Sequence, residues 1–281
     1  MESSKLYLGY AGHCLAKENE AIRGGRKQLI EFKALWGLIE HPTQGLMLFD
    51  TGYTKRFYKA TSSFPNKIYA KITKVTITPE SEVKAQLIAH GIQPEAIKHI
   101  FISHFHADHI AGLRDFPNAT LHASKDALKQ LNSIPKALGF TKGILKELLP
   151  ENYMERISVI ETSVKRNISA LGEVYDLFGD GHIIAVPLPG HAAGQMGLLI
   201  STKKQTYFLV ADACWLKETY KKGTLPHPIV RIFFHSWKDF KNSLTRLRAY
   251  HKENPETIIV PTHCSETTDA LVHKKIDLDV L

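Results

Sequence analysis

The chain has 281 residues and a net charge of +8, and its 43% hydrophobic and 23% charged residues are an ordinary globular composition. A chain of this length can bury a hydrophobic core without disulfides or structural metals, and three cysteines do not suggest a disulfide framework. No stretch approaches the roughly 20 apolar residues of a membrane helix, and the polar start lacks the apolar segment of a signal peptide. We therefore expect a reduced, cytoplasmic protein with no membrane partner.

Apolar segments bounded by turn signals predict a chain that is rich in strands. The segment 29–40 is strongly apolar, which indicates a buried strand, and it returns through a turn into 46–49. The strands expected in chain order are 6–10, 29–40, 46–49, 98–102, 118–123, 158–162, 173–178, 182–187, 196–201, 205–211 and 257–260.

Helix start signals flank these strands. Thr78-Pro79-Glu80 combines a cap, a proline at the first helical position and an acidic first turn, and Ser236 begins a capping box. In the first of these helices, Val83, Leu87 and Ile88 are expected to face the core. The expected helices are 78–91, 124–131, 133–149, 236–254 and one after 265, and a loop is expected at 17–28.

The segment 53–78 is irregular and rich in aromatic residues, namely Tyr53, Phe57, Tyr58, Phe64 and Tyr69. Two interpretations remain open for it. It could form a flap over a functional site, because loops often carry specificity. It could equally be a pair of surface helices with ordinary apolar contacts.

A dense cluster of metal-capable side chains follows the strand expected at 98–102. His104, His106, Asp108 and His109 lie within six positions. Imidazole and carboxylate groups are the usual ligands of zinc and its first-row neighbours. The alternation points three side chains one way and His109 breaks it, so the cluster can face two metal positions. A lone histidine is often an ordinary surface or core residue, but this density favours a metal site at a strand end.

Three further ligand-type residues each follow a buried strand: His191, Asp212 and His263. One such residue would be uninformative, because a capped turn explains it equally well. Three of them downstream of the cluster at 104–109 are harder to attribute to turns, so we expect them to complete the metal site.

Together these motifs resemble the metallo-β-lactamase superfamily, and the resemblance covers nearly the whole chain. It is carried, in the family's order, by Asp50-Thr51-Gly52, the cluster at 104–109, Gly190-His191, Asp212 and His263. The resemblance implies an α/β fold, an αβ/βα four-layer sandwich of two mixed β-sheets flanked by helices. It also implies one domain over residues 1–281, with the metals at one edge of the two sheets.

The resemblance implies a role for each candidate residue. His104, His106 and His191 would hold the first metal, Asp108, His109 and His263 the second, Asp212 would bridge both, and Asp50 would orient ligands through hydrogen bonds. The implied cofactors are two divalent ions, zinc by default, with manganese or iron as alternatives. Such a pair makes hydroxide available near neutral pH and polarises a substrate oxygen. Asp108 would then carry a proton to the leaving oxygen.

Within this family, the single-domain layout and the aromatic segment are most similar to the quorum-quenching lactonases, which open acyl-homoserine lactones. The implied activity is hydrolysis of a lactone or related ester by a metal-bridging hydroxide. Trp215, Phe64 and Tyr69 are the candidates to line the substrate pocket. Trp215 stands where those lactonases often carry a tyrosine, and an indole can donate one hydrogen bond but has no phenolic proton to give.

Two other hydrolases of the superfamily remain as alternatives: a phosphodiesterase or nuclease, which the basic charge favours, and a thioesterase similar to glyoxalase II. The chain lacks a long basic arm, so a small-molecule substrate is expected rather than nucleic acid, and a homodimer is the other partner considered. Cys214 and Cys264 flank candidate ligands, where they could tune the site, be oxidised or simply fill buried space.

Overall fold

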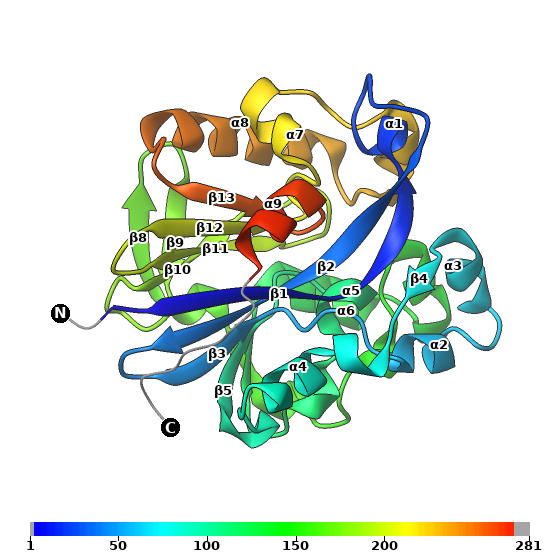
Figure 1. Ribbon diagram of the computed structural model, residues 1–281, viewed down its shortest axis with the longest axis horizontal. Helices are drawn as coiled ribbons and strands as arrows, with labels where there is room; N and C mark the ends of the chain where they lie inside the picture. The colour runs from blue at the N-terminus through cyan, green and yellow to red at the C-terminus, as the bar shows by residue number, and fades with distance from the viewer. Residues whose placement is uncertain (1–2, 273–281) are drawn as a thin grey trace.

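Two mixed β-sheets lie face to face at the centre of the protein, and helices lie on the outer side of each sheet (Figure 1). The computed structural model describes residues 3–272. The first sheet has the order β4 (Val75–Thr76), β1 (Lys5–Lys17), β2 (Leu29–His41), β3 (Gly45–Phe49), β5 (Ile97–Phe101), β6 (Thr120–Ala123) and β7 (Ile157–Val159). The second has the order β13 (Ile258–Pro261), β12 (Thr206–Ala211), β11 (Met196–Ser201), β10 (Ile183–Pro187), β9 (Gly172–Asp176) and β8 (Val164–Ile168). This arrangement is the αβ/βα sandwich that the sequence predicts.

The longest of the described helices is α8 (Trp237–Glu253), with 17 residues. The other α-helices are α1 (Glu18–Ala21), α2 (Arg56–Ala60), α3 (Lys67–Ile72), α4 (Val83–Ala89), α5 (Ala107–Ile110), α6 (Lys125–Ser133), α7 (Lys217–Lys222) and α9 (Ser265–Leu271). The 3-10 helices are η1 (Pro79–Ser81), η2 (Pro94–Ala96), η3 (Leu113–Asp115), η4 (Lys136–Lys142), η5 (Lys146–Leu148), η6 (Tyr153–Arg156), η7 (Ile160–Thr162) and η8 (Pro228–Phe233). Across residues 3–272, no helix has both the length and the apolar character needed to cross a membrane.

Strand β2 is buried on both of its faces, which explains its nearly continuous apolar sequence. Leu35 and Ile39 point between the sheets, where they share a cluster with Leu209 of β12. Trp36 and Leu38 point to the other side and join the cluster beneath the helices. Full burial of one such side chain stabilises the fold by about 1.5–3 kcal/mol, so this strand anchors both layers of the core.

Strand β1 is longer than the predicted strand at 6–10. Its register against β2 shifts between Tyr10 and His13, and Gly12 between them has a φ of 75°. A β-bulge of this kind accommodates an extra residue, and the pairing with β2 continues beyond it, so Gly12 does not end the strand. The loop predicted at 17–28 likewise contains a short helix, α1.

Several other boundaries differ from the sequence-based expectation. Ile88 is 43% exposed rather than buried, because each residue of an α-helix is turned about 100° from its neighbour and Leu87 takes the core position. The helix expected at 133–149 is instead η4 and η5, and 158–162 divides into β7 and η7. Strand β8 was not predicted, since four of its five residues are exposed and it has no apolar pattern.

Three buried or half-buried histidines surround Phe178. The ring centroids of His41, His99 and His122 lie 5.0, 5.0 and 5.9 Å from that of Phe178. His99 Nδ1 and His122 Nε2 are 3.1 Å apart. Burial lowers the pKa of all three histidines, and it lowers the pKa of His122 to about 3. Folding therefore favours the neutral form of these rings.

Acid should destabilise the protein through this histidine group. His122 is neutral in the folded protein, so its contribution to the free energy of unfolding is complete above the pKa of about 6.5 that it has in the unfolded chain. This contribution is lost as the pH falls from about 6.5 towards the folded-state pKa of about 3. One such group adds a slope of up to about 1.4 kcal/mol per pH unit. Urea unfolding between pH 7 and pH 5 should show a shallower loss of stability in His122→Gln than in the wild type. Identical slopes would contradict this expectation.

Candidate metal centre

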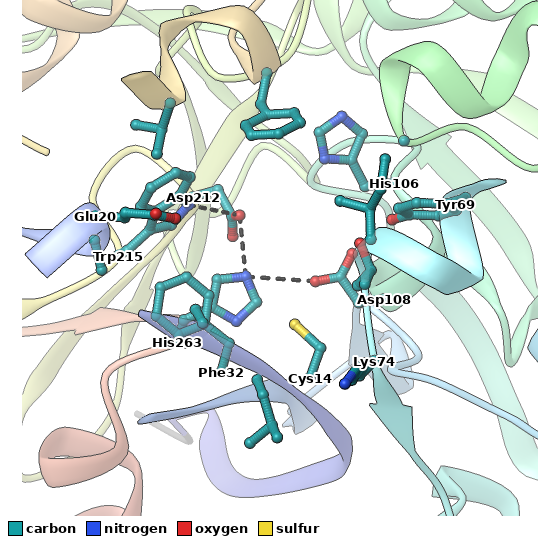
Figure 2. A pocket seen from close by; sticks show the side chains of 18 of the residues that line it. Cys14, Glu20, Phe32, Tyr69, Lys74, His106, Asp108, Asp212, Trp215 and His263 are labelled. Carbon is teal, nitrogen blue, oxygen red and sulfur yellow. Dashed lines mark hydrogen bonds and ion pairs between the residues drawn. The ribbon is translucent and has the colours of Figure 1, made fainter. Parts of the chain in front are cut away.

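All seven residues predicted as metal ligands lie together where strands of both sheets end. They form three overlapping groups, and within each the candidate ligand atoms lie within 4.8 Å of one another: His104, His106 and His191; His104, His109 and Asp212; and Asp108, His109 and His263. Figure 2 shows Asp108, Asp212 and His263 pointing towards one another from three separate elements. Segments far apart in the sequence therefore build one cluster.

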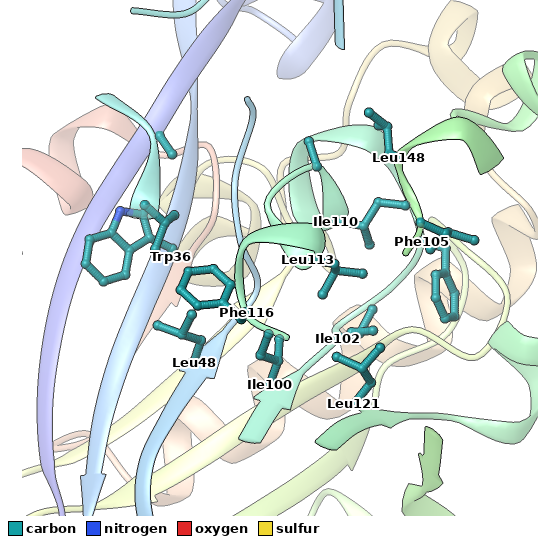
Figure 3. Close-up of a cluster of buried hydrophobic side chains, with 14 of the residues drawn as sticks. Trp36, Leu48, Ile100, Ile102, Phe105, Ile110, Leu113, Phe116, Leu121 and Leu148 are labelled. Carbon is teal, nitrogen blue, oxygen red and sulfur yellow. The ribbon is translucent and has the colours of Figure 1, made fainter. Parts of the chain in front are cut away.

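The segment after β5 divides its side chains between the core and the site. Phe105 is 3% exposed and points into the apolar cluster below the first sheet (Figure 3). The alternate residues His104 and His106 consequently face the other way, into the site. Helix α5 begins directly afterwards and presents Asp108 and His109 from its single turn.

The turn that presents His191 depends on Gly190. Its φ is 137°, and a Cβ at this position would lie 2.1 Å from the backbone nitrogen of Phe240. No other residue fits so close to the start of α8. The glycine therefore allows β10 and α8 to meet where His191 enters the site.

Asp50 holds the cluster from beneath. It is fully buried, and its carboxylate accepts hydrogen bonds from the Ser103 backbone N–H at 2.8 Å and the Ser103 hydroxyl at 2.7 Å. His109 Nδ1 lies 2.7 Å from the same carboxylate and donates to it. Burial raises the pKa of Asp50, and these donors oppose the rise. Because Nδ1 of His109 carries the proton, its Nε2 lone pair faces the site.

His263 is oriented in the same way by a backbone carbonyl. Its Nδ1 lies 3.0 Å from the oxygen of Lys33, which can only accept, so Nδ1 is the donor. The imidazole stacks on Phe32 with ring centroids 4.7 Å apart. Its Nε2 then faces Asp212 Oδ2 at 3.1 Å and Asp108 Oδ2 at 3.4 Å.

This arrangement fits cations at the centre of the cluster. Nε2 of His109 and Nε2 of His263 face carboxylate oxygens at 3.1–3.4 Å, an arrangement that a positive charge between them stabilises, whether a proton on the imidazole or a metal ion. His104 Nε2, His109 Nε2 and Asp212 Oδ1 are also buried with no hydrogen-bond partner among the described residues. Imidazole nitrogens and carboxylates are the donors that zinc and similar divalent metals prefer.

Burial and the mutual effect of imidazoles and carboxylates set the protonation states in the site. Burial lowers the pKa of His104 and His106, to about 3 for His106. Burial alone would raise the pKa of Asp108 and Asp212, but nearby imidazoles outweigh it, holding Asp108 at about 2 and Asp212 well below its ordinary value. Burial opposes protonation of His109 and His263 as well, but the neighbouring carboxylates outweigh it and raise the pKa of both imidazoles. At neutral pH the site therefore offers ionised carboxylates and neutral His104 and His106, and a metal ion would take the place of a proton on His109 and His263.

A cavity of about 610 Å³ opens above the cluster, and Asp108, Asp212 and His263 form part of its floor. Trp215 and Tyr69, two of the three residues expected in the substrate pocket, are among its lining residues. The segment 53–78 contributes part of the wall: Tyr53, Tyr69, Ile72, Thr73 and Lys74. It contains α2, α3 and β4.

Phe64, the third residue expected in the substrate pocket, lies away from this cavity. Phe64 is 79% exposed and is absent from the lining of the cavity. It lies in the turn before α3, whereas Tyr69 lies within α3, where its ring packs 5.7 Å from that of Phe57. The helix turns Tyr69 inward and leaves Phe64 in solvent.

Sequence reasoning missed most of the apolar wall. Leu29, Phe32, Phe140, Val230 and Phe233 all line the cavity, together with Cys14. They come from strands and short helices whose inward face depends on tertiary packing, so no local signal identifies them.

The two cysteines beside the candidate ligands are buried. Cys214 and Cys264 are 1% and 2% exposed. Burial raises the pKa of Cys214 well above its ordinary value, so its thiol stays protonated. Of the three roles left open by the sequence, packing is the one that this burial supports.

Comparison with known proteins agrees with this geometry. The family model described as "Metallo-beta-lactamase superfamily" matches residues 30–263, which is most of the chain. The chain belongs to the metallo-beta-lactamase superfamily. The matched range contains all seven candidate ligands, from His104 to His263.

Several relatives within the metallo-beta-lactamase superfamily are lactonases. An N-acyl homoserine lactonase AttM of Agrobacterium fabrum is 25% identical over 178 residues, which are 62% of this chain and 61% of the relative. The match thus spans less than two thirds of that relative. The AttM lactonase of Azorhizobium caulinodans is 28% identical over 253 residues, covering 88% of this chain and 89% of the relative.

Solved structures share the same superfamily fold. A quorum-quenching N-acyl homoserine lactone lactonase superimposes with a TM-score of 0.74 and 20% identity, covering 98% of both chains. The dizinc quorum-quenching lactonase AidC superimposes with a TM-score of 0.60 and 18% identity, covering 94% of this chain and 88% of AidC. At this level of identity the likeness supports the fold.

Proposed function

We propose that the protein is a dinuclear metal-dependent hydrolase that opens a lactone with an apolar acyl chain. One observation carries the proposal: seven ligand-type side chains meet in one cluster, and five of them line a largely apolar cavity. The relatives named N-acyl homoserine lactonases support the same substrate class.

In this proposal each ligand keeps the role that the family resemblance implies. His104, His106 and His191 would hold one metal, Asp108, His109 and His263 would hold the other, and Asp212 would be shared between them; all seven lie in the three overlapping groups of candidate ligands. Bound divalent metals would supply an activated water at neutral pH and polarise the substrate carbonyl. Asp50 supports the centre by fixing the tautomer of His109.

Asp108 is the proposed proton carrier. Its side chain is 11% exposed and lines the cavity, where a carboxylate can accept a proton and give it back. Water adds to the lactone carbonyl, and the ring C–O bond breaks. Asp108 takes the proton from the water and passes it to the departing alkoxide oxygen, so the product is a hydroxy acid.

The cavity wall favours an acyl chain over a phosphate backbone. Its apolar side chains include Leu29, Phe32, Ile72, Phe140 and Phe233. A phosphodiester remains the second candidate because Lys17, Lys74 and Lys142 also line the cavity. Lys17 is already paired with Glu20 at 2.8 Å, which leaves less positive charge for an anion.

The test is a substrate panel with the zinc-loaded protein: lactones of increasing acyl length, a phosphodiester and a thioester. We expect kcat/KM for lactones to rise with acyl length, because each buried methylene adds about 0.8 kcal/mol. Phe233→Ala should flatten this dependence at unchanged metal content, since Phe233 lines the cavity. Phe64→Ala is the matched control, because that ring lies outside it. Faster cleavage of the phosphodiester than of every lactone would favour the second candidate instead.

A further inference from the structure

Trp215 touches the candidate bridging ligand directly. Its indole N–H donates a hydrogen bond to Asp212 Oδ2 at 3.2 Å (Figure 2). Trp215 is 9% exposed and Asp212 is 3% exposed, so the contact is shielded from water. The two residues are three positions apart in the turn after β12, where Ala211 adopts a left-handed φ of 47°.

The other neighbours of Asp212 are candidate metal ligands themselves. Oδ2 lies 3.3 Å from His191 Nε2 and 3.1 Å from His263 Nε2, and Oδ1 lies 3.4 Å from His109 Nε2. An imidazole that binds a metal through Nε2 has no proton there to donate. Indole nitrogen, in contrast, is only a donor. Of the contacts recorded for Asp212 in residues 3–272, the hydrogen bond from Trp215 is the one that metal binding leaves intact.

Aromatic packing fixes the direction of this donor. The ring of Trp215 lies 5.6 Å from Phe32 of β2, 5.3 Å from Phe234 and 5.8 Å from His191, measured between centroids. Phe234 in turn packs 4.7 Å from Phe240 of α8. The indole is therefore held from several elements and cannot swing away from the carboxylate without repacking them.

We propose that Trp215 is a positioning residue of the metal centre, whose N–H holds the Asp212 carboxylate in the orientation that bridges two ions. The inference rests on the proposed dinuclear site, and it gives Trp215 a function beyond lining the cavity. Groups that hydrogen-bond to metal ligands typically contribute about ten- to hundredfold in metal affinity. Trp215 should therefore affect metal binding even when no substrate is present.

The test measures zinc affinity by chelator competition, without turnover. Trp215→Phe keeps an aromatic ring but removes the N–H, and the more weakly held zinc ion should bind about ten- to hundredfold more weakly. Trp237→Phe is the control. That ring packs against Phe240, outside the ligand cluster, so Trp237→Phe should change zinc affinity by less than about twofold. In an Asp212→Ala background, Trp215→Phe should have no further effect on the remaining zinc affinity.

A second measurement uses the wild-type protein alone. In ¹H–¹⁵N spectra of tryptophan-labelled protein, one indole N–H should be protected from exchange and should shift when zinc is added. Unchanged zinc affinity in Trp215→Phe, or indole signals that all ignore zinc, would overturn the inference and leave Trp215 as a wall residue. If the wild type itself takes up no zinc, the proposed function fails instead, so the two failures are distinguishable.

Discussion

Asp212→Ala should lower lactone hydrolysis by at least about a hundredfold, the largest effect expected of any single change. Asp212 is common to both halves of the cluster, with His109 on Oδ1 and His191 and His263 on Oδ2. Without its carboxylate, the imidazoles face one another with no negative charge between them. The variant should therefore lose hydrolysis and metal together.

The measurement is kcat/KM on the best lactone, with metal content determined on the same sample. Asp126→Ala is the matched control, because Asp126 is an exposed aspartate at the start of α6 and should leave both quantities near wild type. Turnover of Asp212→Ala close to that of the wild type would mean that the bridging role is misassigned.

Asp108→Asn should have the second largest effect, and a different signature. The amide keeps an oxygen that can reach the metal but cannot carry a proton. Loss of a general acid–base group typically costs about 10²–10⁴ in rate. We expect a loss of this size on alkyl lactones while most of the metal is retained.

The leaving group distinguishes this role from a purely structural one. A nitrophenyl ester releases a phenolate that departs without protonation, so Asp108→Asn should impair its hydrolysis much less than that of a lactone. An equal loss on both substrates would contradict proton delivery by Asp108 and leave it as a ligand only.

The candidate ligands could be picked out from the sequence because their positions follow simple rules. Strands buried on both faces are strongly apolar, so their ends can be recognised in the sequence, and His191, Asp212 and His263 each follow such an end within a short turn. The density at 104–109 then indicates metal without any knowledge of the fold. The structure agrees in bringing all of these residues together.

The residues that line the cavity could not be predicted from the sequence, because tertiary packing decides which side chains turn inward. Phe64 and Tyr69 are five positions apart in one aromatic segment, yet only Tyr69 lines the cavity. Nothing local decides which of the two turns inward. The same holds for Trp215, whose contact with Asp212 needs the rings of Phe32 and Phe234 from distant elements to hold it.

The most direct test of the proposed dinuclear centre is the metal content of the purified protein after removal of metal and reconstitution with zinc. We expect about two zinc ions per chain, because the proposed function divides the seven candidate ligands between two ions. His104→Ala and His263→Ala, which belong to different sets, should each remove about one of them. A wild-type value below about half an ion per chain would contradict a resident metal centre and, with it, the proposed hydrolysis.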